Sequence, residues 1–97
     1  MNEIFPKYKG SRIVIASRVV DRELTELGLD LWGVKEILEI GFDCPIGRRK
    51  SSIEEKCIKV GVIVIKVVVE KTEAEEENVW NLRHAGMFAW KRGRFEI

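Results

Sequence analysis

Glutamine is absent from this sequence of 97 residues, asparagine occurs three times and histidine once. Scarce thermolabile amides, together with many Glu, Lys, Val and Ile residues, favour a protein from a thermophile. An excess of charge of one sign is also missing, because 17 Lys and Arg residues are balanced by 16 Asp and Glu residues. No global field therefore attracts nucleic acid or anionic membrane, and such binding would need a local patch.

Long apolar runs are absent as well. The longest is too short and too rich in β-branched residues to cross a membrane, and the start, MNEIFPKYKG, lacks the apolar region of a secretion signal. We therefore expect a cytoplasmic protein with no membrane partner. Its length suits one domain over residues 1–97, with a loose leader at 1–11 and a C-terminal tail at 89–97.

The two cysteines, Cys44 and Cys57, do not form a CxxC pair. With a single histidine in the chain, zinc ligands are too few, and we expect no metal and no cofactor. Two buried thiols are the simpler interpretation. A bridge between the cysteines stays open if their strands are neighbours, since intracellular disulfides occur in thermophiles.

The segment Val62–Val69 holds seven β-branched residues interrupted only by Lys66. A run that is apolar at both odd and even positions predicts a central strand covered on both faces. A preceding strand at 53–58 completes a hairpin, and we expect Lys59-Val60-Gly61 to form a three-residue turn with Gly61 in the left-handed region.

That turn predicts a register in which Ile58 lies opposite Val62, and Glu54 opposite Lys66. One face of the hairpin then packs under helices and carries Ile53, Cys57, Ile63, Ile65, Val67 and Val69. The other face is half apolar and half charged, and its apolar members are Ile58, Val62, Val64 and Val68.

Two helices are predicted at 18–27 and 31–40. Apolar residues recur at helical spacing in both segments, Ser17 and Asp30 supply N-caps, and Gly28 and Gly41 mark the ends. Further strands are expected at 12–16, 42–46 and 79–88, with the acidic residues 72–78 as a solvated turn. The order is β-α-α-β-β-β-β, an α+β fold in which an αα-hairpin packs on one face of an antiparallel sheet.

The segment SRVVDRELTELGLDLWGVKEILEIG resembles the opening of small proteins assigned to the RelE/ParE toxin superfamily. The matching residues are Gly28, Leu29, Asp30, Val34, Leu38 and Gly41, and the likeness in element order covers about residues 12–88. The histidine that opens the first helix of those proteins is missing, and Leu27 stands where an arginine would precede Gly28. The resemblance implies a toxin–antitoxin protein that contacts RNA or the ribosome, as a ribonuclease toxin or an inactive relative, with an antitoxin protein as a possible partner.

RelE-type ribonucleases position RNA with lysines, arginines and a late tyrosine on the open sheet face. The resemblance implies Lys66 and Arg83 as comparable strand residues, with RNA-binding cations at Arg48, Arg49, Lys50, Arg92 and Arg94. The only tyrosine, Tyr8, lies at the other end of the chain. If the protein is an enzyme, this resemblance makes it an RNA endonuclease.

Each candidate also has a structural interpretation. The basic loop at 48–50 can be a solvated loop that guards an edge strand, and Lys66 can pair across strands with Glu54. His84 can act as general base beside Arg83, but successive strand residues point to opposite faces unless a bulge intervenes. Otherwise His84 is a core histidine.

A different class of function follows from the half-apolar face of the hairpin. Helices cover only one side of a sheet, so the apolar residues on the other side need shielding by the C-terminal tail or by a partner. The alternative to an RNA-directed protein is therefore a non-enzymatic interaction module, a homodimer or a partner-bound subunit.

Overall fold

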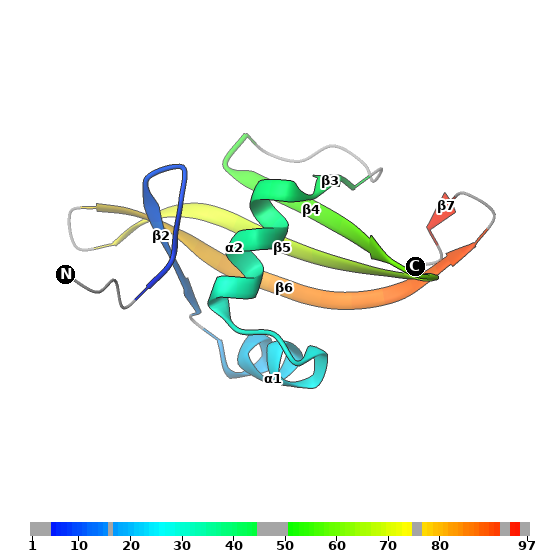
Figure 1. Ribbon diagram of the computed structural model, residues 1–97. Coiled ribbons are helices and arrows are strands. Elements are labelled where there is room, and N and C mark those ends of the chain that lie inside the picture. The colour runs from blue at the N-terminus through cyan, green and yellow to red at the C-terminus, as the bar shows by residue number, and fades with distance from the viewer. Residues whose placement is uncertain (1–4, 16, 45–50, 75–76, 92–93, 96–97) are drawn as a thin grey trace.

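The computed structural model describes residues 5–15, 17–44, 51–74, 77–91 and 94–95. Two helices pack against one side of a curled, mixed sheet, which confirms the α+β class (Figure 1). The helices are α1 (Arg18–Leu27) and α2 (Leu31–Ile40). The strands are β1 (Lys7–Tyr8), β2 (Ser11–Ile15), β3 (Phe42–Asp43), β4 (Ile53–Val60), β5 (Ile63–Ala74), β6 (Glu77–Lys91) and β7 (Arg94–Phe95).

Both helices have the predicted bounds, because local capping sets their ends. Ser17 Oγ accepts a hydrogen bond from the Val19 amide at 3.1 Å, and Asp30 Oδ1 accepts one from the Gly33 amide at 2.9 Å. Gly28 ends α1 in the left-handed region with a φ of 70°. These caps satisfy amides and carbonyls that a helix end leaves without intrahelical partners.

The sheet has the strand order β1-β2-β6-β5-β4-β3, and β7 pairs with β6 off this path. An all-antiparallel sheet was the wrong expectation, because β2 runs parallel to β6, with Ile13 opposite Trp80 and Ile15 opposite Leu82. The long route from β2 through both helices and three strands allows the chain to return in the same direction, which a short hairpin cannot do.

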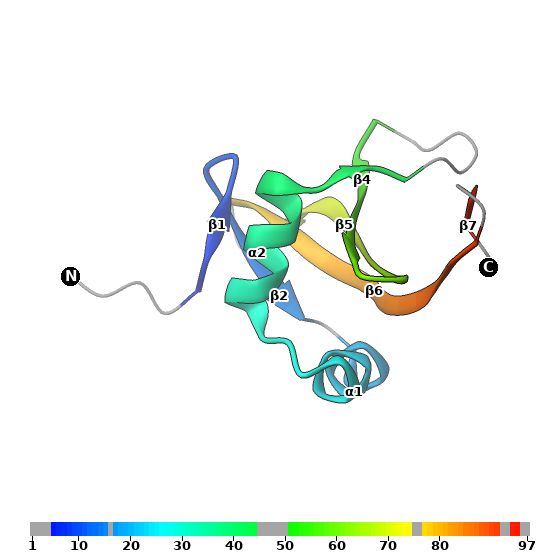
Figure 2. The ribbon, with the colours of Figure 1, turned by 45° about the vertical axis from the view of Figure 1, so that its right-hand side comes forward.

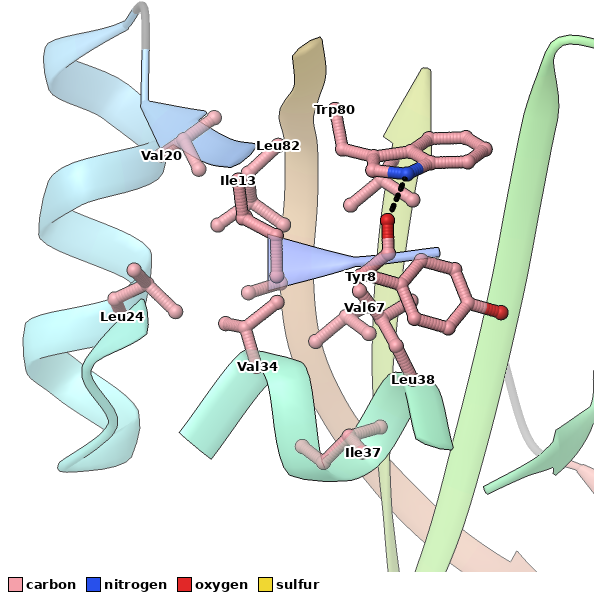
Figure 3. Close-up of a cluster of buried hydrophobic side chains, with 12 residues drawn as sticks. Tyr8, Ile13, Val20, Leu24, Val34, Ile37, Leu38, Val67, Trp80 and Leu82 are labelled. Atoms are coloured by element: carbon pink, nitrogen blue, oxygen red, sulfur yellow. Dashed lines mark hydrogen bonds between the residues drawn. The ribbon is translucent and has the colours of Figure 1, made fainter. Parts of the chain in front are cut away.

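Residues assigned to a loose leader are part of this sheet. Lys7 and Tyr8 form β1, which pairs antiparallel with β2, and the Tyr8 side chain is buried. The Trp80 indole donates a 2.8 Å hydrogen bond to the Tyr8 carbonyl (Figure 3). Residues 89–91 of the expected tail belong to β6, and residues 94–95 form β7.

The turn between β4 and β5 has two residues, Gly61 and Val62, instead of the expected three. Val60 lies opposite Ile63, and Gly61 occupies the first turn position with a φ of 63°. A two-residue hairpin with glycine first matches a type II′ turn, whose twist suits the flanking strands. The acidic turn expected at 72–78 is also shorter than predicted, because β5 continues to Ala74 and β6 begins at Glu77.

The tighter turn changes which residues of β4 face the helices. Ile58 lies opposite Ile65 and packs against the core, whereas Cys57 lies opposite Lys66 on the far side. The expectation for β5 was correct at Val67 and Val69, which are fully buried in the core. A shift by an odd number of positions reverses the faces of one strand relative to its neighbour.

The core lies between the helices and β2, β5 and β6 (Figure 3). Its members are Tyr8, Ile13, Val20, Leu24, Val34, Ile37, Leu38, Val67, Val69, Trp80, Leu82 and Ala85. The sheet curls strongly away from the helices (Figure 2), and Val64 and Val68 on its far side are buried within one chain. The four residues expected to form an open apolar face are therefore split among the core, the far side and the turn.

Cys44 and Cys57 are bonded to each other, with their Cα atoms 5.6 Å apart. The interpretation as two thiols was wrong. Phe42 lies opposite Cys57 in the β3–β4 ladder, which brings the chain just beyond β3 next to Cys57. The bridge thus ties the end of β3 to the middle of β4.

Candidate functional site

The candidate site lies where β2 ends and β6 continues. Ile15, the last residue of β2, is opposite Leu82, and beyond that point α1 packs along β6 (Figure 1). The ladder to β5 is interrupted here as well. Val69 pairs with Leu82 and Val68 pairs with His84, so Arg83 is an extra residue in a β-bulge.

The bulge brings Arg83 and His84 to the same side of the sheet. The Arg83 guanidinium lies 3.3 Å from Glu70 Oε1, and Glu70 shares the far face with Lys66. Beyond the bulge Ala85 enters the core, so His84 also turns to the far face. The bulge that allows Arg83 and His84 to lie on one face is therefore present.

His84 is paired with Glu23 of α1. Its Nδ1 lies 3.3 Å from Glu23 Oε2, and the other carboxylate oxygen accepts a 3.1 Å hydrogen bond from the Ala85 amide. The imidazole side chain is 48% exposed, so the alternative of a core histidine was wrong. A carboxylate beside Nδ1 favours the tautomer that carries its proton there and leaves Nε2 able to accept one.

Gly86 makes room for the imidazole ring. A Cβ atom at this position would lie 3.0 Å from His84 Nε2, which means that the ring leans along the strand over Gly86. Lys66 lies directly opposite Gly86 on β5. Lys66 and His84 are therefore diagonal neighbours on one face.

Lys66 does face away from the helices, but its carboxylate neighbour is not the one expected. Lys66 Nζ lies 3.9 Å from Glu55 Oε1, and only 12% of the lysine side chain is exposed. Glu54 instead faces the helix side and binds Lys9 Nζ at 2.8 Å. The reversed face of β4 accounts for this exchange of neighbours.

A cavity of about 340 Å³ opens beside the bulge, between α1 and β6. It is lined by Ser17, Val19, Val20, Glu23, Asn81, Leu82 and Arg83. Asn81 Oδ1 is buried and has no hydrogen-bond partner among the described residues. A buried acceptor is costly when it is unsatisfied.

Several sequence candidates cannot be placed. Arg48, Arg49, Lys50 and Arg92 lie outside the described residues, and for Arg94 the structure gives only its backbone pairing with Lys91. Among the described residues, no three His, Cys, Asp or Glu side chains gather as metal ligands. No helix in the described segments is long and apolar enough to cross a membrane.

Sequence reasoning singled out Lys66, Arg83 and His84, but it missed Glu23, Asn81 and Gly86. Glu23 sits in an amphipathic helix among other charged residues, and nothing in its local pattern marks it. Comparisons with protein-family models, with curated proteins and with solved structures found no match to this chain.

Proposed function

We propose that this chain is a RelE-like protein that binds RNA and cleaves it as a ribonuclease, with His84 as the general base. The observation that carries the proposal is the bulge at Arg83. It sets a guanidinium and an imidazole on one face of β6, and Glu23 lies behind the imidazole. Cleavage of a phosphodiester next to a ribose hydroxyl requires a base and a cation that reach the same nucleotide, and this face of β6 offers one of each.

In the proposed reaction, His84 Nε2 accepts the proton of a ribose 2′-hydroxyl. The 2′-oxygen forms a bond to the neighbouring phosphorus, and the bond from phosphorus to the 5′-oxygen breaks. The 5′-oxygen takes a proton from water and leaves as a hydroxyl, the hydroxide that remains takes the proton held by His84, and a 2′,3′-cyclic phosphate is formed. Glu23 is a positioning residue, because it holds Nδ1 and orients the ring.

The cations act on the phosphate. Arg83 can contact its oxygens with two parallel donors, and the charge that develops on those oxygens during attack strengthens this contact. Lys66 is diagonal to His84 on the neighbouring strand, where Glu55 at 3.9 Å offsets part of its charge. Asn81 lines the cavity beside Arg83, where a base or ribose group can enter.

Purified protein and a single-stranded RNA oligonucleotide test the proposal. His84→Ala should lower the cleavage rate by about 10²- to 10⁴-fold, the usual contribution of a positioned general base. Glu23→Gln should lower it less, because the imidazole stays in place but loses its charged neighbour. Arg83→Ala should weaken RNA binding and reduce the slope of log affinity against log salt by about 1.

Lys35→Ala is the matched control, because it removes a partly exposed cation on α2 whose ion-pair partner among the described residues is Glu39. Its cleavage rate and salt slope should equal those of the unchanged protein. Binding without cleavage would identify an inactive relative of the ribonucleases. If RNA is neither bound nor cleaved, or if His84→Ala behaves like Lys35→Ala, the proposal fails.

On this proposal, the cell holds the protein in check with an antitoxin protein. Expression of the chain alone should then arrest growth, and His84→Ala should relieve the arrest. If cells that express the unchanged chain and cells that express His84→Ala grow equally, any toxicity does not depend on this site.

A further inference from the structure

A second cavity lies where α1 turns into α2, beside the segment that leads into β1. Its volume is about 330 Å³, and four parts of the chain meet around it: residues 5–6, the end of β2, α1 and the start of α2. Small-molecule sites are concave and begin at about 300 Å³, so this cavity has room for a small ligand. Asp21 lines this cavity, whereas Glu23, which points to another side of α1, lines the cavity of the candidate site.

The lining of this second cavity is largely apolar and partly aromatic. Its apolar members include Leu24 and Leu29, and its aromatic members are Phe5 and Trp32. Trp32 is 48% exposed although it is large and apolar. The Arg12 guanidinium carbon lies 5.3 Å from the centroid of the Phe5 ring, so this ring already attracts one cation. The lining therefore suits the apolar body of a ligand and accommodates a positive charge beside it.

The polar side chains of the lining present acceptors. Besides the Trp32 indole they are Asp21, Thr25 and Asp30. The Thr25 hydroxyl donates to the Asp21 carbonyl oxygen at 3.0 Å, so its own oxygen remains able to accept. Asp30 uses Oδ1 to cap α2 through the Gly33 amide at 2.9 Å, which leaves Oδ2 for a ligand. A group that carries several N–H donors and a positive charge fits this set of acceptors best.

The charge of the lining is negative. The described residues around the cavity include two carboxylates and no Lys, Arg or His. Asp21 forms no ion pair in the described part of the chain, although exposed Arg18 shares an adjoining hollow with it. The N-terminus of α2 contributes about half a positive charge, which the carboxylate of Asp30 alone outweighs. A cation therefore complements the cavity.

We propose that this cavity binds a small organic cation, a primary ammonium group on an apolar body. The positive charge faces the carboxylates of Asp21 and Asp30, and its N–H donors find acceptors there and at Thr25. The apolar body packs against Leu24 and the exposed Trp32 ring. An ammonium group has three donors and no acceptor, which matches the polar groups that the lining presents.

A small molecule is favoured over a protein partner by the extent of the surface. A stable protein interface covers about 800 Å² on each partner, and its centre is apolar. Trp32 is the one exposed large apolar side chain among the described residues of this lining. The proposal does not depend on the proposed ribonuclease activity.

Calorimetric titration of the full chain with phenethylammonium at low salt tests the proposal. One molecule should bind per chain, whereas phenethyl alcohol, which has the same body without the charge, should bind at least about tenfold more weakly, because charged hydrogen bonds are the strong ones. Asp21→Asn should weaken the binding of phenethylammonium by about tenfold for the same reason. Asp30→Asn keeps an acceptor for the Gly33 amide and should weaken it too.

Glu26→Gln is the matched control, because it removes an exposed carboxylate of α1 that is not among the residues of the lining. This variant should bind phenethylammonium as the unchanged protein does. Circular dichroism of all three variants should equal that of the unchanged protein.

Nuclear magnetic resonance of the indole N–H groups locates the site without a charge variant. The Trp32 signal should shift during the titration, whereas the signal of Trp80, whose N–H donates to the Tyr8 carbonyl, should keep its position. Absent binding, equal binding of the ammonium and the alcohol, an Asp21→Asn variant that binds like Glu26→Gln, or an unmoved Trp32 signal would each overturn the proposal. Tighter binding of a lysine-containing tripeptide than of phenethylammonium would also overturn it, since the occupant would then be a protein side chain.

Discussion

The Tyr8 hydroxyl donates a 2.6 Å hydrogen bond to Glu54 Oε1, which joins the N-terminal hairpin to β4 across 46 residues of sequence. Burial, reinforced by the neighbouring carboxylate, raises the pKa of Tyr8 to about 12. Burial alone would raise the pKa of Glu54, but hydrogen bonds from Lys9 and Tyr8 outweigh it and lower that pKa. The single tyrosine of the chain is therefore a structural group that links two elements.

This link predicts a loss of stability in alkali. Well below pH 10, the ordinary pKa of tyrosine, folded and unfolded chains both keep the phenol proton and the contribution is constant. As the pH rises from 10 to about 12, the unfolded chain loses this proton first, so the free energy of unfolding should fall. Ultraviolet absorbance of the phenolate measures the titration directly, because no other tyrosine is present.

Glu54→Gln supplies the control, since it keeps a hydrogen-bond acceptor and removes the negative charge. The pKa of Tyr8 should then fall, but remain above its ordinary value because the ring stays buried. An unperturbed Tyr8 titration in the native protein would contradict the contact.

The disulfide predicts a redox-dependent stability. Cys44 and Cys57 are 13 residues apart, and closing a loop of about 15 residues stabilises a fold by about 3 kcal/mol in the chain-entropy account. A reducing agent should therefore lower the free energy of unfolding in urea by about that amount. Because Cys57 is fully buried, the bridge should resist mild reductant until the protein opens.

The double variant Cys44→Ala, Cys57→Ala should be less stable and should not respond to reductant. Equal unfolding midpoints for the native protein with and without reductant would mean that the bridge contributes nothing.

The N-cap of α2 predicts a small loss of stability when the capping side chain is removed. Asp30→Ala removes the acceptor of the Gly33 amide and should lower the free energy of unfolding by about 1 kcal/mol. Asp30→Asn keeps an acceptor oxygen at the same place and should cost much less. Thermal unfolding of the three proteins measures both changes, and an equal loss in the two variants would rule out the cap as the cause.

The helices could be read from the sequence because their signals are local. A cap such as Ser17 or Asp30 acts on amides two or three residues away, so the bounds 18–27 and 31–40 follow from short stretches of chain. The β-branched run at 62–69 likewise marks a central strand, and its burial pattern at Val67 and Val69 was predictable.

The candidate site was predictable only in part. Residue type drew attention to Lys66, Arg83 and His84, but which of them share a face depends on the bulge at Arg83. Around that bulge, β6 pairs with β5 on one side and adjoins the end of β2 and α1 on the other. No residue near Arg83 in the sequence predicts this bulge.

The amino-acid sequence by itself determined the two helices, the central strand and the α+β class, because their signals lie within a few residues. Only the tertiary structure decided the two-residue turn at Gly61, the parallel pairing of β2 with β6, the Cys44–Cys57 bridge and the meeting of Glu23 with His84. The parallel pairing, the bridge and the meeting of Glu23 with His84 join positions that are apart in the chain, and the turn sets the register of the whole β4–β5 ladder. A shift of strand register by one residue costs little locally and reverses a whole face, so packing must choose among the registers.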